Sequence, residues 1–160
     1  MATKVEPVPA GYHTVTPYLS VKGAAKALDF YQRAFGAEVL VRMDLPDGRV
    51  GHAEMKIGDS FVMLADEMPE MADAVTQSPQ TAGATTFGLM IYLPEVDARF
   101  KRALEAGAKV KRPVQDQFYG DRTGTLEDPF GHIWTIGTHV EDVSPEEMKK
   151  RMAAFTQAKK

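Results

Sequence analysis

Two hydrophobic periods alternate along this chain: apolar residues recur every second position in some stretches and every third or fourth in others. The first period is typical of strands that bury one face, and the second of helices that bury one stripe. In the first half they predict a helix over 24–35 and strands over 13–21, 39–44, 50–57 and 60–66. Gly36 is placed to end the helix. Because Pro17 has no N–H, the first strand is predicted to lie at a sheet edge or to carry a bulge.

The second half repeats this order of elements. The predictions are strands over 87–93, 109–112, 123–127 and 132–138 and a helix over 95–106. Pro113 is expected to end the short second strand, and a loop over 114–120 follows it. Ser144-Pro145-Glu146-Glu147 has the pattern of a helix start, which predicts a C-terminal helix over 144–158. The apolar stripe of that helix comprises Met148, Met152 and Phe155.

Identical residues recur at two nearly equal spacings, so the chain contains an internal repeat. Ala27, Gly36, Ala37 and Val39 recur 71 positions later, at Ala98, Gly107, Ala108 and Val110. Gly51, Glu54 and Gly58 recur 73 positions later, at Gly124, Glu127 and Gly131. A repeat this long indicates that a whole supersecondary unit was duplicated. We predict an α+β fold of two tandem βαβββ modules that form a curved mixed sheet around a cup.

The domain organisation follows from these elements. We expect a single domain over 1–160, with module one over 13–66, module two over 86–138 and the C-terminal helix over 144–158. Residues 1–12 form a loose lead-in. Residues 67–85 hold prolines and small polar residues without periodicity, so we interpret them as a linker, with a flap over a site as the alternative. The apolar stripe of the C-terminal helix favours a homodimer.

Composition and charge narrow the possible partners. Hydrophobic residues make up 44% and charged residues 26%, which is ordinary for a globular domain. The net charge of −3 argues against nucleic-acid binding, which requires a basic stripe. The chain has no cysteine, which excludes disulfides and thiolate zinc sites. No apolar run approaches about 18 residues and no signal segment is visible, so we expect a cytoplasmic protein without a membrane segment.

Several segments resemble one known superfamily. They are Ala27-Leu28-Asp29-Phe30-Tyr31 with Phe35-Gly36-Ala37, and Asp128-Pro129-Phe130-Gly131-His132. Within tandem βαβββ modules they resemble the vicinal oxygen chelate superfamily, which includes glyoxalase I, extradiol dioxygenases, epimerases and bleomycin-resistance proteins. The resemblance covers 13–138. Residues 116–122 and 140–147 are similar to its glyoxalase-like, phosphonate-operon-like branch. This fold hosts several chemistries, so the resemblance does not imply one activity.

The resemblance implies a metal site whose ligands this chain lacks. Metal-dependent members place ligands at positions that align with Thr16, with Val62 or Leu64, with Gly88 or Phe87, and with Thr135. None of these residues supplies the imidazole or carboxylate that a divalent cation needs there. We therefore expect no metal at the superfamily position. A displaced divalent metal site at His52, Glu54 and Asp66 is the alternative.

Strand alternation predicts which residues face the cup. In module one the odd-numbered strand positions, Val15 and Phe61 among them, are mainly apolar and are assigned to the helix-covered face. The cup then receives Thr16, Tyr18, Leu40, Arg42, Asp44, His52, Glu54, Val62, Leu64 and Asp66. This assignment requires an odd-length loop near Gly58, since a two-residue turn would slip the register by one. Module two contributes Gly88, Met90, Tyr92, Thr123, Thr125, Ile133, Thr135 and Gly137, with Trp134 in the core.

His52 and Glu54 are the candidate catalytic residues. They lie two positions apart on one strand face, where His52 can act as a general base oriented by Glu54 or Asp66. A hydrogen-bonded strand histidine without chemistry is the alternative. The candidate ligand-binding residues are Thr16, Tyr18, Arg42, Asp66, Tyr92, Phe118, Tyr119, Arg122 and Thr135.

The aromatic and basic residues among these candidates have two interpretations each. Phe118 and Tyr119 can form an aromatic lid, and Arg122 an anion clamp, because a guanidinium binds carboxylate or phosphonate through two hydrogen bonds. The alternatives are packing at the rim of the cup and a surface ion pair with Asp121.

Two functions are compatible with these residues. The first is a cofactor-free binding protein of the bleomycin-resistance type, which fits the missing metal ligands and an apolar cup with few polar groups. Its small-molecule ligand is expected to be acidic, because the cup offers guanidinium and imidazole groups. The second is a metal-dependent lyase, isomerase or dioxygenase with the displaced site. The sequence does not decide whether the protein is an enzyme.

Overall fold

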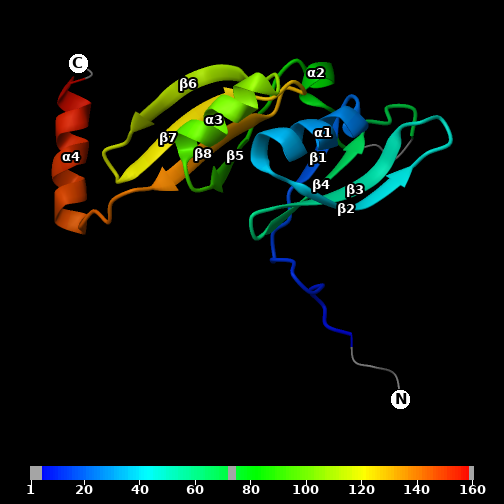
Figure 1. The fold of residues 1–160 in the computed structure, drawn as a ribbon, viewed down its shortest axis with the longest axis horizontal. Coiled ribbons are helices and arrows are strands. Elements are labelled where there is room, and N and C mark those ends of the chain that lie inside the picture. Colours follow the sequence, from blue (N-terminus) through cyan, green and yellow to red (C-terminus); the bar gives the residue numbers. More distant parts are fainter. Residues whose placement is uncertain (1–4, 72–74, 159–160) are drawn as a thin grey trace. The chain divides into compact units, whose positions relative to one another are not determined.

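The computed structural model describes residues 5–71 and 75–158 and contains two modules of the same plan (Figure 1). Module one contains β1 (Tyr18–Val21), α1 (Ala24–Phe35), β2 (Glu38–Asp44), β3 (Val50–Ile57) and β4 (Ser60–Asp66). Module two contains β5 (Gly88–Tyr92), α3 (Val96–Glu105), β6 (Lys109–Asp116), β7 (Asp121–Glu127) and β8 (Ile133–His139). The strand orders are β1-β4-β3-β2 and β5-β8-β7-β6. The outer pairs β1–β4 and β5–β8 are parallel and the other pairs antiparallel, which confirms the α+β fold of tandem βαβββ modules.

The chain divides into two compact units that follow these modules. One comprises residues 1–85 with 129–131, and the other residues 86–128 with 132–160. Residues 129–131 join the first unit, where the Phe130 ring lies 6.3 Å from that of Phe30. None of the helices within 5–71 and 75–158 is both long and apolar enough to cross a membrane.

The helix α1 forms where the apolar period predicts it. Its buried stripe includes Ala27, Leu28 and Tyr31, and it packs on one face of the module one sheet. Gly36 ends the helix with a φ of 72°, and its N–H donates to the Gln32 carbonyl at 3.1 Å. Both the position and the end of this helix are as predicted.

The predicted register of β4 is wrong. The β3–β4 connection is a two-residue turn in which Ile57 pairs with Ser60 and Gly58 has a φ of 61°. Leu64 therefore lies opposite the buried Ala53. The residues of β4 exchange faces relative to the prediction: Val62, Leu64 and Asp66 lie on the helix-covered side, and Phe61, Met63 and Ala65 lie on the other side.

A bulge at Leu40 reverses the predicted faces of β2 from Val41 onward. Val39 pairs with Met55, but Val41 pairs with Glu54, so one extra residue is inserted between them. Met43 consequently opposes His52, while Arg42 opposes Ala53. Arg42 is exposed and pairs with Asp44, whose Oδ1 lies 2.9 Å from its Nε. The prediction that Arg42 faces the cup is wrong.

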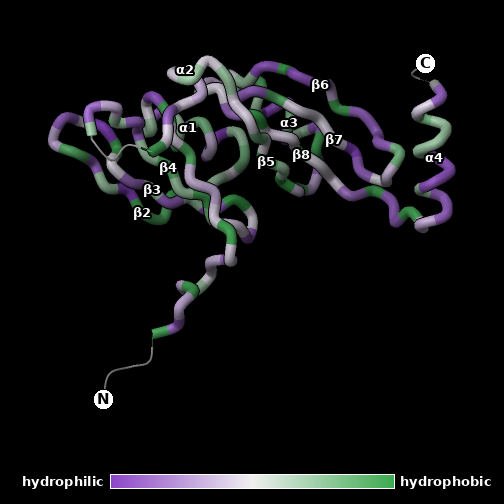
Figure 2. The backbone as a smooth tube through the Cα atoms, turned by 180° about the vertical axis from the view of Figure 1, so that it is seen from behind, coloured by the Kyte–Doolittle hydropathy of each residue, from purple (hydrophilic) through white to green (hydrophobic). Residues whose placement is uncertain are grey.

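Two strands differ in length from the predictions. The edge strand β1 begins only after Pro17, and Val15, which was assigned to the buried face, precedes it and is 81% exposed. The strand β6 continues through Pro113 to Asp116. It is an edge strand with register shifts, where a proline is tolerated, and it is largely hydrophilic (Figure 2).

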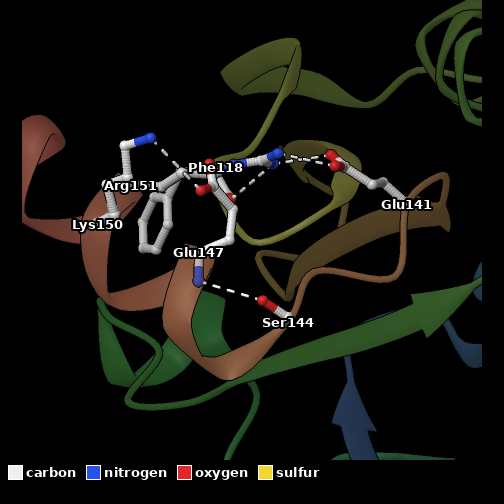
Figure 3. Close-up of polar contacts among 6 residues, drawn as sticks. All are labelled: Phe118, Glu141, Ser144, Glu147, Lys150 and Arg151. Carbon is white, nitrogen blue, oxygen red and sulfur yellow. Dashed lines mark hydrogen bonds and ion pairs between the residues drawn. The ribbon is translucent and has the colours of Figure 1, made fainter.

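The helices α2 and α4 complete the structure. The short α2 (Pro79–Ala82) lies within the segment predicted as a linker or flap, and Ser78 caps it by accepting from the Thr81 N–H at 3.2 Å. The C-terminal α4 (Pro145–Ala158) begins as the sequence predicts. The Ser144 hydroxyl accepts from the Glu147 N–H at 3.3 Å (Figure 3).

Candidate functional site

The candidate site lies on the sheet face of module one opposite α1, which we call open face one. The residues of this face are Tyr18, Ser20, Val41, Met43, His52, Glu54, Lys56, Phe61, Met63 and Ala65. The strands β3 and β1 place His52, Glu54 and Tyr18 here, as predicted. The face combines aromatic and thioether groups with one imidazole, one carboxylate and one ammonium group.

His52 is held between two partners on this face. Its Nδ1 lies 3.0 Å from the Tyr18 hydroxyl, and its Nε2 lies 3.2 Å from Glu54 Oε1. An ionised carboxylate only accepts hydrogen bonds, so Nε2 of the ring carries a proton. Nδ1 of a neutral ring then accepts from the Tyr18 hydroxyl. Burial raises the pKa of that hydroxyl. This arrangement fixes the orientation and tautomer of the imidazole, as a binding or proton-transfer site requires.

Glu54 extends the chain of hydrogen bonds to Tyr12. The Tyr12 hydroxyl donates to Glu54 Oε2, and its ring stacks on Phe61 with 4.1 Å between centroids. The hydrogen bonds from Tyr12 and then His52 lower the pKa of Glu54. Burial, followed by the contact with Glu54, raises the pKa of Tyr12 to about 12. Glu54 is thereby ionised and Tyr12 protonated at neutral pH.

A pocket of about 190 Å³ adjoins this hydrogen-bonded chain at Tyr18. It is lined by Tyr18, Ser20, Ala65, Asp66, Glu67, Met68, Met71 and Thr76. Met68, Met71 and Thr76 come from the segment that the sequence predicted as a linker or flap. The pocket gives open face one a concave, partly apolar region beside its polar groups.

Glu67 forms hydrogen bonds that hold the start of α2, in the segment that borders the pocket. Its carboxylate accepts from the Ser78 N–H at 2.9 Å and from the Thr81 hydroxyl at 2.6 Å. Burial favours a higher pKa, but the hydrogen bonds from Thr81 and Ser78 outweigh it and lower the pKa of Glu67 to about 2. An ionised Glu67 thus ties α2 to the end of β4.

The carboxylate of Asp66 supports the fold on the helix-covered side of the sheet, although the residue also borders the pocket at the end of β4. Its Oδ1 accepts from the Gly23 and Ala24 N–H groups at 2.7 and 3.0 Å, and its Oδ2 accepts from the Val50 N–H at 2.8 Å. The carboxylate caps α1, whose N-cap Gly23 offers no side chain. The prediction that Asp66 joins His52 and Glu54 is wrong, because it lies on the opposite side of the sheet.

The side chains present do not fit the superfamily metal. Val62 and Leu64 are buried on the helix-covered side, and the Thr135 hydroxyl lies 3.0 Å from that of Thr125. Thr16 is half-buried before β1. The displaced set of His52, Glu54 and Asp66 does not converge. Within the described ranges, no group of three His, Cys, Asp or Glu residues is arranged to hold an ion.

Arg122 is already occupied by two carboxylates. Its Nε and Nη2 each donate to Asp97 at 2.8 Å, and its Nη1 donates to Asp116 at 3.0 Å. Asp97 belongs to α3, so the guanidinium lies on the helix-covered side of the module two sheet. The predicted ion pair with Asp121 is not formed. The predicted anion clamp would require Arg122 to leave both of these partners.

A second polar cluster lies on the open face of module two. Asp121, which is buried, accepts from the Tyr92 hydroxyl at 2.6 Å and contacts His139 Nδ1 at 2.7 Å. His139 Nε2 lies 3.0 Å from Asp142. Burial favours a higher pKa for Asp121, but the hydrogen bonds from Tyr92 and His139 outweigh it and lower the pKa. The hydrogen bonds to Asp121 and then Asp142 raise the pKa of His139.

The contact between His139 and Asp121 predicts a pH dependence of stability. A histidine whose pKa is raised by folding stabilises the protein fully below its ordinary pKa of about 6.5, and this contribution is lost as the pH rises through the raised value. We expect the wild type to exceed His139→Gln in free energy of unfolding by more at pH 5.5 than at pH 8.5. Urea unfolding at the two pH values measures this. A difference that grows with pH would contradict the assignment.

Phe118 and Tyr119 lie in the turn between β6 and β7, and Phe118 contacts α4 (Figure 3). Its ring lies 5.2 Å from that of Phe155 and 5.3 Å from that of Tyr119. Arg151 of α4 binds Glu141 through two hydrogen bonds of 2.7 Å and Glu147 through one of 2.9 Å. These contacts fit the packing interpretation of Phe118 better than that of a lid.

Sequence reasoning missed Tyr12, which it placed in the loose lead-in. Periodicity carries no signal for a residue outside helices and strands, and the contacts of Tyr12 lie 42 and 49 positions along the chain. The only available hint was an aromatic residue beside a glycine. The structure therefore brings together Tyr18, His52 and Glu54 of the predicted set and adds Tyr12.

Comparisons with known proteins agree with this fold. The model of the family described as Glyoxalase/Bleomycin resistance protein/Dioxygenase superfamily matches residues 12–136. The uncharacterized protein Mb0911c of Mycobacterium bovis is 40% identical over 154 residues, covering 96% of this chain and 97% of the relative. Protein YjdN of Escherichia coli is 28% identical over 145 residues, covering 76% of this chain and 92% of YjdN. The crystal structure of TioX from Micromonospora sp. ML1 aligns with a TM-score of 0.62 at 26% identity, covering 80% of this chain and 99% of TioX.

Proposed function

The chain belongs to the Glyoxalase/Bleomycin resistance protein/Dioxygenase superfamily, and we propose that it binds a small molecule on open face one without the superfamily's usual metal. One observation carries this proposal: Tyr18 both lines the pocket and contacts the oriented imidazole of His52. A concave, partly apolar surface with a few convergent polar groups is the usual form of a small-molecule site. The ligand would pack on Tyr18 and Met68 and reach His52 Nδ1 with a polar group that displaces the Tyr18 hydroxyl.

On open face one the ammonium of Lys56 partly offsets the nearby carboxylates, so the charges there favour a neutral ligand. The expectation of an acidic ligand rested on the guanidinium groups of Arg42 and Arg122 and on the imidazole of His52, and of these only the imidazole lies on this face. The carboxylates of Glu54 and Glu67 lie on it or line its pocket. An aromatic molecule fits the tyrosine and thioether groups, since methionine sulfur contacts aromatic rings favourably. The pocket is smaller than the 300 Å³ or more of typical drug-sized sites, which favours a small ligand.

Replacing His52 with alanine tests this proposal. If the ligand forms a charge-assisted hydrogen bond with His52, the loss is about 1.5–3 kcal/mol, or roughly a 10- to 100-fold weaker affinity. Small aromatic compounds that bind the wild type in ligand-observed NMR would be titrated against the variant by calorimetry. Arg42→Ala is the matched control, because Arg42 is exposed on the opposite face, and we expect its affinity to be unchanged. Equal affinities of both variants, with the fold intact by circular dichroism, would contradict the proposed site.

The homodimer stays a prediction. Met152 and Phe155 of α4 are 56% and 43% exposed, so the apolar stripe of this helix has surface that a second copy can cover.

A further inference from the structure

We propose that Tyr12 occupies a subsite for small phenol-like molecules, and that an external aromatic ring with a hydrogen-bond donor competes with it there. The subsite consists of Phe61 and Glu54 at the β3–β4 end of open face one. The inference rests on the proposed function, because it assigns a ligand class to the same face. It differs in its residues, which lie beside the pocket at Tyr18 and do not line it.

The contacts of Tyr12 are those of a bound phenol. Its ring lies 4.1 Å from the Phe61 ring at an interplanar angle of 26°, and its hydroxyl donates to Glu54 Oε2. Stacking of aromatic rings and a charge-assisted hydrogen bond are the two interactions that position an aromatic ligand. The backbone of Tyr12 lies outside any strand or helix.

The receiving residues are fixed by the sheet and do not depend on Tyr12. Phe61 lies in β4 opposite Lys56 of β3, whose ammonium lies 6.0 Å from the ring centroid. Glu54 lies in β3 and is held from its other oxygen by His52. Because Glu54 is ionised, it accepts only, so the subsite selects a ring that carries a donor. Removal of Tyr12 would leave a stacking surface and an acceptor that water alone satisfies.

The segment that carries Tyr12 is suited to leave the subsite. Residues 5–17, which precede β1, lie outside any helix or strand. A turn holds Tyr12 locally, in which its N–H donates to the Pro9 carbonyl at 3.0 Å. Gly11 allows the chain to approach the ring, since a Cβ there would lie 3.2 Å from Phe61 Cε2. Release of Tyr12 would break the stack and the hydrogen bond without unpairing a strand.

The test uses 4-methylphenol, which is the tyrosine side chain without its backbone. Isotopically labelled wild type and Tyr12→Ala would be titrated with it, with the amide signals of Glu54 and Phe61 followed by NMR. A tethered group competes at an effective concentration in the millimolar range. We therefore expect 4-methylphenol to bind Tyr12→Ala about tenfold more tightly than the wild type. Val15→Ala, an exposed neighbour in the same segment, should behave as the wild type.

Two further arms separate the ring from the donor. With Tyr12→Ala, 4-methylanisole has the same ring but no donor and should bind more weakly than 4-methylphenol. Tyr12→Phe keeps the stack and should bind 4-methylphenol more weakly than Tyr12→Ala does. Equal affinity of the wild type and Tyr12→Ala, or no shift at Glu54 and Phe61, would overturn the inference. That result, together with His52-dependent binding of other compounds, would leave the proposed function intact.

Discussion

Replacing Trp134 with alanine is expected to lower the free energy of unfolding by about 4 kcal/mol. The side chain is fully buried in β8, opposite Leu126, and truncation of a buried tryptophan costs about 3–5 kcal/mol. Its Nε1 also donates to Asp128 Oδ2 at 2.9 Å, so the substitution removes a partner from a buried carboxylate. Urea unfolding followed by circular dichroism measures the change. Tryptophan fluorescence is not a usable signal here, because Trp134 is the only tryptophan and the variant lacks it.

Two variants control for this effect. Trp134→Phe keeps most of the apolar volume but loses the indole N–H, so it should cost less than the alanine variant. Val110→Ala, half-exposed in the edge strand β6, should change the free energy of unfolding by no more than about 0.5 kcal/mol. A loss below about 1 kcal/mol for Trp134→Ala would show that this residue does not anchor the core of module two.

Replacing Asp66 with alanine is expected to cost about 3 kcal/mol. The carboxylate satisfies three backbone N–H groups, those of Gly23, Ala24 and Val50. Each buried donor left without a partner costs about 1–3 kcal/mol, and water can reach some of them after the side chain is removed. Asp66→Asn keeps one acceptor oxygen and should lose less. A stability equal to that of the wild type, measured by urea unfolding, would refute the capping role.

Local patterns predicted the elements of this fold. The order of helices and strands and the helix end at Gly36 depend on neighbours within a few positions, and the repeat is visible as recurring identities, so the sequence shows all of these directly. Capping by Asp66 could not be predicted in this way. In module two the Thr138 hydroxyl likewise accepts from the Val96 N–H at 3.1 Å, 42 positions away. Both helices are capped from a late strand of their own module, and only the tertiary structure brings those residues together.

The predicted faces of the strands are wrong because of two local irregularities. The two-residue turn at Gly58 and the bulge at Leu40 each shift the alternation by one position. As a result Arg42 and Asp66 lie outside the predicted site, whereas Tyr18, His52 and Glu54 lie together in it. Alternation is reliable within a strand, but register between strands depends on turn lengths that the sequence left open. The role of Tyr12 could not be predicted for another reason, because this residue lies outside every periodic element.

The location of a bound molecule tests the central claim most directly. Crystals of the protein grown with a small aromatic compound that binds the wild type would show where the compound lies. We predict density against Tyr18 and Met68, with a polar atom within hydrogen-bond distance of His52 or Glu54. Density confined to module two, with open face one unchanged, would contradict the proposed function.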